Sequence, residues 1–202
     1  MRYFPAFIIL IHGCIHCMGF AKAFGYGNIT AITKTISKTY GTFWMLTALL
    51  FALAAILLVL KKHSWCYIAL FAVLISQVLI IMVWKDAKYG TVANLLIVVT
   101  ALIGLATQQF EHRYAKDVKA YIKNCGQFTP SILTEQDILQ LPDPVKKYLH
   151  YTHSIGQPKI KNFKVEFTGG IRKKSQQNYM PFKSEQHNFT DAATRLFFMN
   201  AA

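Results

Sequence analysis

The sequence predicts an α+β membrane protein, in which a four-helix transmembrane bundle precedes short helices and the start of an antiparallel β-sheet. Three observations predict this fold. Only 15% of the 202 residues are charged, whereas soluble domains average about 25%. Residues 1–110 contain eight basic residues and one acid, while the rest of the chain contains fourteen and eight. After Pro158 the apolar residues change from a helical to an alternating pattern, which indicates strands.

Four segments are apolar over a length that suits a bilayer core, which needs roughly 20 residues in a helix. The first covers residues 3–24, with Pro5 tolerated in the first turn. The others cover residues 43–60, 65–84 and 91–107. The third is bracketed by two tryptophans, which are typical of membrane interfaces. We therefore expect a multi-pass protein of the inner cell membrane.

The first segment also fits a cleavable signal peptide, because Arg2 precedes it and Ala21-Lys22-Ala23 fits a cleavage site. Its apolar run continues to Phe24 and is longer than the usual signal core. We therefore expect a retained helix. With four spans both termini lie on the same side, and seven basic residues there against five on the other side favour the cytoplasm.

The segment after the first span has a helical repeat of apolar residues. Ile29, Ile32, Ile36 and Tyr40 recur three or four residues apart, with Asn28 as a candidate N-cap. This pattern predicts a short helix near residues 29–40 that lies flat at the membrane interface. A strand or a loop is the alternative, because the segment is rich in Thr and Ile.

The remainder divides into two parts. Residues 111–130 continue the fourth span as a polar juxtamembrane helix and linker. Residues 131–202 form a domain with short helices and four candidate strands, in which Gly169-Gly170 predicts a hairpin turn. Such a sheet has an apolar face that needs a cover. Either the helices around 132–152 cover it, or the chain is the front part of a longer protein.

Alternation of apolar and polar residues gives this sheet one apolar strand face, formed by Phe163, Val165 and Phe167.

The net charge of +13 does not indicate nucleic acid, because no recognised nucleic-acid motif accompanies it. Attraction of juxtamembrane lysines to anionic lipid headgroups explains the charge.

No catalytic motif is present. Glu185 and His187 share a strand face, but an exposed polar face explains them equally well, so we assign no catalytic residue.

Three segments carry a family resemblance: HGCIHCMGFAKAFG near the N-terminus, LPDPVKKYLHYTHSIGQPKIKNFKVEFTGGIRKK, and YMPFKSEQHNF. Together they resemble a bacterial membrane-protein family known only as a domain of unknown function. The resemblance implies an N-terminal helical bundle with an HGxIHxxGFxKAF-like motif, followed by a β-rich domain. It implies no activity. One departure is Tyr179, where the family has Trp.

The first span places two imidazoles in an apolar run. His12 and His16 lie four residues apart, so a helix puts both on one face. Polar groups inside a membrane face the bundle interior and pair with one another. We therefore expect an intramembrane polar cluster of His12, His16, Gln77 and Asn94.

The alternative is a site for a metal, a haem or a quinone. The spacing of His12 and His16 suits two zinc or copper ligands, with further ligands supplied by another segment. The pair cannot give both axial ligands of one haem, because these approach from opposite faces. The sequence itself requires no cofactor.

Two functional hypotheses follow. The first is a non-enzymatic membrane protein that anchors a basic β-rich domain and binds lipid, an apolar ligand or a protein partner. The second is a metal-, haem- or quinone-binding membrane protein that uses His12 and His16.

Overall fold

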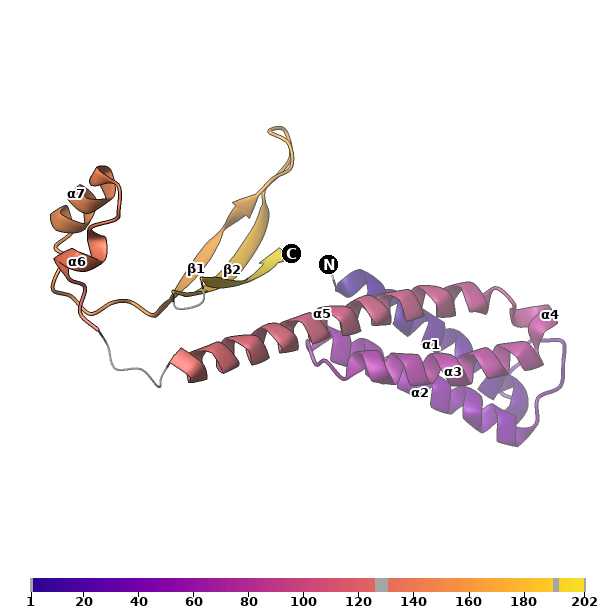
Figure 1. The fold of residues 1–202 in the computed structure, drawn as a ribbon. Coiled ribbons are helices and arrows are strands. Elements are labelled where there is room, and N and C mark those ends of the chain that lie inside the picture. The colour runs from indigo at the N-terminus through magenta and orange to yellow at the C-terminus, as the bar shows by residue number, and fades with distance from the viewer. Residues whose placement is uncertain (1, 126–130, 191–192, 202) are drawn as a thin grey trace. The chain divides into compact units, whose positions relative to one another are not determined.

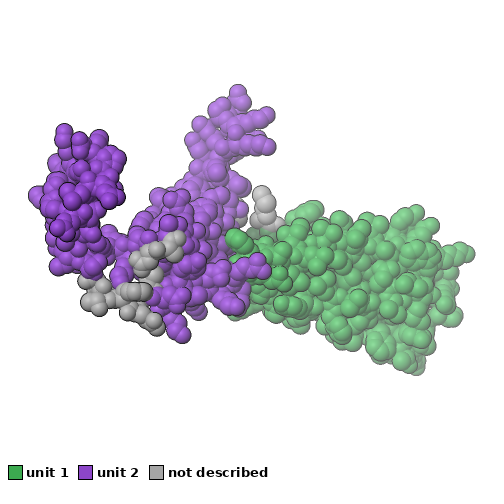
Figure 2. Space-filling model, in the orientation of Figure 1, with its two compact units in different colours: residues 1–110 green, residues 111–202 purple. Residues whose placement is uncertain are grey.

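The computed structural model describes residues 2–125, 131–190 and 193–201. The chain divides into two compact units, residues 1–110 and residues 111–202, which Figure 2 colours green and purple. The predicted fold class is confirmed: long apolar helices are followed by short helices and an antiparallel sheet. Residues 126–130, part of the predicted linker, lie outside the described residues.

The first unit is built from apolar helices that lie beside one another (Figure 1). They are α1 (Tyr3–Phe24), α2 (Lys38–Val59), α3 (Trp65–Met82), the short α4 (Trp84–Ala87) and α5 (Gly90–Cys125). Four of the five are long and apolar enough to cross a membrane. At 1.5 Å per residue, the 36 residues of α5 extend about 54 Å, well beyond a hydrocarbon core of about 30 Å.

Small residues allow these helices to pack closely, as is typical of membrane bundles. The main core is rich in alanine, and Phe51 lies at its centre without exposed surface. At Gly19 of α1, any Cβ atom would collide with the indole ring of Trp44 on α2. Many large apolar side chains of α1, α2, α3 and α5 point outward instead, which suits a lipid environment.

The predicted interfacial helix near residues 29–40 is wrong. Residues 25–37 form a loop, and α2 begins only at Lys38, where the Ser37 side chain accepts a hydrogen bond from the Tyr40 amide. The apolar repeat had a different cause, because Ile32 is buried against Trp44, Leu79 and Val83. The loop therefore packs on the bundle through Ile32, with Ile36 partly buried against the same cluster.

The second unit contains the polar end of α5, the helices α6 (Glu135–Ile138) and α7 (Asp143–Tyr151), and a sheet. The sheet has three antiparallel strands in the order β1 (Asn162–Ile171), β2 (Met180–Phe189) and β3 (Thr194–Ala201). The predicted turn at Gly169-Gly170 is wrong, because both glycines pair with β2 inside β1. The connection is the loop 172–179, so the described residues contain three strands in place of the four candidates.

Candidate functional site

His12 and His16 face the interior of the bundle. Their exposed fractions are 3% and 1%, and their ring centroids lie 4.9 Å apart on the same side of α1. Aromatic rings enclose them: Phe51 lies 5.1 Å from the His12 ring and Trp44 lies 5.0 Å from the His16 ring. The spacing of four residues thus produces the shared face that the sequence predicted.

Hydrogen bonds join both imidazoles to α3 and α5. The hydroxyl of Ser76 donates to Asn94 Oδ1 at 3.1 Å, and His12 Nε2 lies 2.9 Å from the same oxygen. Because a carbonyl oxygen only accepts, His12 Nε2 is the donor. His16 Nε2 lies 2.8 Å from Ser76 Oγ. Which of these two atoms donates depends on the tautomer of His16.

The network continues along the helix interface. Asn94 Nδ2 donates to Gln77 Oε1 at 3.0 Å, and Gln77 Nε2 donates to Thr91 Oγ1 at 3.1 Å. The structure thus brings together all four residues of the predicted polar cluster. The predicted polar cluster did not include Ser76, although its hydroxyl oxygen lies within hydrogen-bond distance of the Nε2 atoms of both histidines. Its position in an apolar span, directly before Gln77, was the signal that could have found it.

One nitrogen of this network has no partner. The Nδ1 atom of His16 is buried, and within residues 2–125, 131–190 and 193–201 nothing forms a hydrogen bond with it. In the tautomer that carries its proton on Nε2, Nδ1 of the neutral ring has a free lone pair. A free acceptor inside a membrane bundle is costly unless something binds it.

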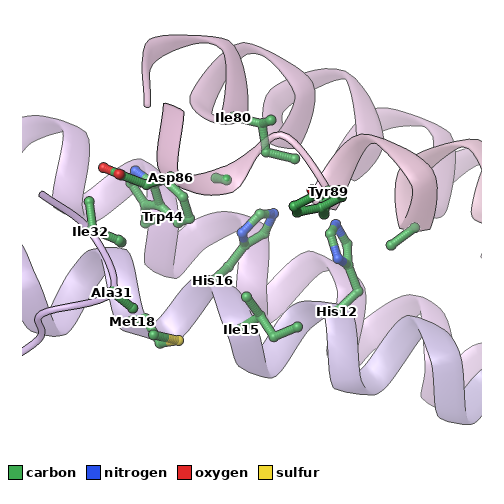
Figure 3. A pocket seen from close by; sticks show the side chains of 13 residues that line it. His12, Ile15, His16, Met18, Ala31, Ile32, Trp44, Ile80, Asp86 and Tyr89 are labelled. Atoms are coloured by element: carbon green, nitrogen blue, oxygen red, sulfur yellow. The ribbon is translucent and has the colours of Figure 1, made fainter. Parts of the chain in front are cut away.

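Both histidines line a pocket of about 310 Å³ (Figure 3). Its wall is mainly apolar and includes Trp44, Ile80 and the loop residue Ile32. Figure 3 shows the two imidazoles side by side on α1, and Tyr89 is another residue that lines the pocket. The remaining lining residues are Ile15, Met18, Ala31, Asp86, Ala87, Gly90 and Ala93.

Asp86 attaches the loop 25–37 to the pocket wall. Its carboxylate accepts hydrogen bonds from the Thr33 amide at 2.8 Å and from the Thr33 hydroxyl at 2.9 Å. The Thr33 amide is the main reason that the pKa of Asp86 lies below its ordinary value. Lys34 Nζ donates to the Met82 carbonyl oxygen at 2.9 Å. This loop therefore closes one side of the pocket through specific polar contacts, which the sequence did not reveal.

The metal hypothesis gains no further ligand. Across the part of the chain that the structure describes, no three His, Cys, Asp or Glu side chains gather closely enough to hold an ion. The Nε2 atoms of both histidines are engaged by Asn94 and Ser76. A metal or haem bound through His12 and His16 stays a prediction.

The sheet separates the other predicted residues onto two faces. Phe163, Val165 and Phe167 alternate along β1 and lie on one face, where Phe163 and Phe167 are 46% and 51% exposed. Glu185 and His187 lie on the opposite face, their side chains 3.1 Å apart. That face packs against the polar end of α5, where Tyr114 donates to Glu185 Oε1 at 3.2 Å. Glu185 and His187 therefore belong to a packing contact.

A third partner joins Glu185. Lys164 Nζ lies 2.8 Å from Glu185 Oε2 and 2.6 Å from Glu166 Oε1. The hydrogen bond from Lys164 is the main reason that the pKa of Glu185 lies below its ordinary value. This ionic group connects β1 with β2 beneath α5.

Comparison with known protein families gives a match to the C-terminal part of the chain. No curated protein and no solved structure shows a significant match to the chain. The histidine motif of α1 lies outside the segment that does match a family. That segment, residues 131–202, contains α6, α7 and the sheet, and it matches the model of a family of unknown function, DUF6544, as the resemblance of these residues predicted.

Proposed function

We propose that this protein is an integral membrane protein that binds a small, mostly apolar ligand in the pocket beside His12 and His16. The observation that carries the proposal is the buried Nδ1 atom of His16, which has no partner in residues 2–125, 131–190 or 193–201 and belongs to a residue of the pocket wall. A ligand with one hydrogen-bonding group supplies the missing partner.

The pocket determines the size and polarity of the ligand. Small-molecule pockets commonly hold about 300–1,000 Å³ and have apolar walls with a few polar groups. A volume of about 310 Å³ is at the lower end of that range and suits a single substituted ring. The apolar wall favours a ring without charge. Membrane-soluble quinols and quinones are the class that combines these properties.

The hydrogen-bond network determines the polar group of the ligand. We place the His16 proton on Nε2, which then donates to Ser76 while the Ser76 hydroxyl donates to Asn94, so that Nδ1 accepts. A ligand hydroxyl donates to such an atom, whereas a carbonyl oxygen does not. The proposal therefore favours the quinol over the quinone. Ser76 contacts the His16 imidazole and Asn94 contacts Ser76, so the imidazole is already held in place before the ligand binds. Little conformational entropy of the protein is therefore lost on binding.

The test is a titration of the detergent-purified full chain with a decyl-substituted benzoquinol, followed by the matching quinone, using calorimetry without oxygen. We expect the quinol to bind more tightly. His16→Phe should weaken quinol binding roughly 3- to 10-fold, which corresponds to the loss of one hydrogen bond of about 0.5–1.5 kcal/mol. The control is His63→Phe, because His63 is exposed in the connection between α2 and α3.

A second pair of variants tests the pocket without touching the histidines. Ala93→Phe should fill the pocket and abolish binding, because Ala93 lines it. Ala106→Phe adds the same ring at an exposed position of the same helix and should bind as the wild type does. The proposal fails if the quinol does not bind the wild type, or if Ala93→Phe and Ala106→Phe bind it equally.

A further inference from the structure

The face of the sheet opposite α5 is apolar and open to its surroundings. Strand register places side chains of paired residues on the same face, so β2 and β3 add Phe182, Phe197 and Met199 to this face. Phe197 and Met199 are 48% and 41% exposed. We call this surface the open face; its large apolar residues are Phe163, Val165, Phe167, Ile171, Met180, Phe182, Phe197 and Met199.

The two faces differ because only one has a cover. Tyr114 and Tyr121 of α5 pack against the opposite face, with ring centroids 5.5 Å from Phe198 and 5.0 Å from Phe189. As a result Phe189 is only 3% exposed. The expectation that helices around residues 132–152 cover the open face is not met, because Phe163 and Phe167 keep about half of their surface exposed.

Charge distinguishes the faces as well. Within the described strands, both acids, Glu166 and Glu185, lie on the α5 face, where each contacts Lys164. The only charged side chain that the described strands place on the open face is Arg195, which pairs with Asn188. The loop 172–179 begins with three consecutive basic residues directly after Ile171. The open face thus has apolar and aromatic side chains on β1 and β3, the polar side chains of Ser184, Gln186 and Asn188 on the central strand β2, and positive charge at its border.

We propose that the open face docks on the surface of an anionic lipid bilayer. Aromatic rings partition into the interface between headgroups and acyl chains, and neighbouring Lys and Arg are attracted to anionic lipids. The chain supports this occupant, because the sheet follows α5, whose first half is apolar enough to cross a membrane. A second copy of the sheet is a poorer occupant, since two open faces would bring like charges together.

The experiment uses the full chain in nanodiscs, with a photo-crosslinking benzoylphenylalanine at residue 167 in place of Phe. Phe167 is an exposed aromatic of the open face, and Tyr151 of α7, which is 84% exposed, carries the same probe as the control. Intact mass spectrometry identifies each adduct by its mass. In discs that contain phosphatidylglycerol, we expect the lipid adduct at residue 167 to exceed that at residue 151 more than about fivefold.

The charge is tested with Arg172→Gln combined with Lys173→Gln and Lys174→Gln, three changes in an exposed loop. They should reduce the lipid adduct at residue 167 at least about threefold, and discs of phosphatidylcholine alone should reduce it similarly. Equal lipid labelling at residues 167 and 151 overturns the proposal. So does a crosslink between two copies of the chain in place of a lipid adduct.

Discussion

The polar network of the bundle makes a quantitative prediction at Asn94. Its amide forms three hydrogen bonds, accepting from His12 and Ser76 and donating to Gln77. Asn94→Leu keeps the approximate size of the side chain and removes all three. Hydrogen bonds between helices in a membrane contribute about 0.6 kcal/mol each, so the free energy of unfolding should fall by about 2 kcal/mol.

The partners of Asn94 keep other contacts, which limits the loss. His12 Nε2 remains 3.3 Å from Ser76 Oγ, and Gln77 still donates to Thr91. A buried polar group that loses every hydrogen-bond partner lowers the free energy of unfolding by about 1–3 kcal/mol. That cost should not apply to His12 and Gln77, because each keeps another partner. Gln77→Leu removes only the outer end of the network, with two hydrogen bonds, and should cost about 1 kcal/mol.

The measurement is unfolding of the purified protein in mixed micelles with increasing dodecyl sulfate, followed by tryptophan fluorescence. Asn94→Leu should raise the unfolding equilibrium constant about 30-fold. Thr100→Leu is the matched control on the same helix, because the Thr100 hydroxyl is exposed and bonds only to the Leu96 carbonyl of its own helix. If Asn94→Leu and Thr100→Leu unfold alike, the network does not stabilise the bundle and the reasoning is refuted.

Three further predictions concern other contacts. Asp86→Asn should speed amide hydrogen exchange at Thr33, because it weakens the hydrogen bonds from Thr33 to the Asp86 carboxylate. These hydrogen bonds lower the pKa of Asp86. Their stabilisation of the loop is therefore present above about pH 4 and is lost as the pH falls through the lowered pKa. Unchanged exchange in the variant would contradict this. Glu185→Gln should speed exchange in β2 more than Glu166→Gln does, since Glu185 also bonds to α5. That difference should be present at pH 7 and vanish in acid, because the pKa of Glu185 is also lowered. Gly19→Leu should lower the free energy of unfolding by roughly 1–3 kcal/mol through collision with the neighbouring indole, and an unshifted midpoint in dodecyl sulfate would refute that close approach.

The spans were predictable because their cause is local. A bilayer core demands about 20 apolar residues in succession, and the sequence supplies them without interruption. The polar cluster was predictable for a related reason. Hydrocarbon offers no partner to an imidazole or an amide, so the few polar residues of the spans had to meet.

The loop 25–37 was not predictable because its partners are distant in the chain. Thr33 is held by Asp86, 53 residues further on. Ile32 is buried by side chains of α2, α3 and the connection to α4. A repeat of isoleucines every three or four residues looks the same whether one face of a helix or separate residues of a loop are buried. Local periodicity therefore could not distinguish the two.

The glycine pair in β1 misled for a different reason. Gly169-Gly170 has the composition of a two-residue hairpin turn, yet the strand continues through it. A Cβ atom at Gly170 would lie 2.9 Å from Tyr179 Cβ, and one at Gly169 would lie 3.2 Å from Phe182 Cε1. The glycines thus make room for aromatic side chains near the loop end of the hairpin, a requirement that appears only once the strands are paired.

The two nitrogens of His16 have different explanations. The bond from Nε2 to Ser76 is accounted for by stability, because it joins α1 to α3 inside the bundle. Nδ1 forms no such stabilising hydrogen bond within the described residues. A phenyl ring at this position would pack against Trp44 and Phe51 without burying an unpaired acceptor, which costs free energy in an apolar medium. Packing therefore explains one nitrogen of this imidazole and binding explains the other. Ser76→Ala should weaken the fold, whereas His16→Phe removes the same bond to Ser76 and should weaken ligand binding as well.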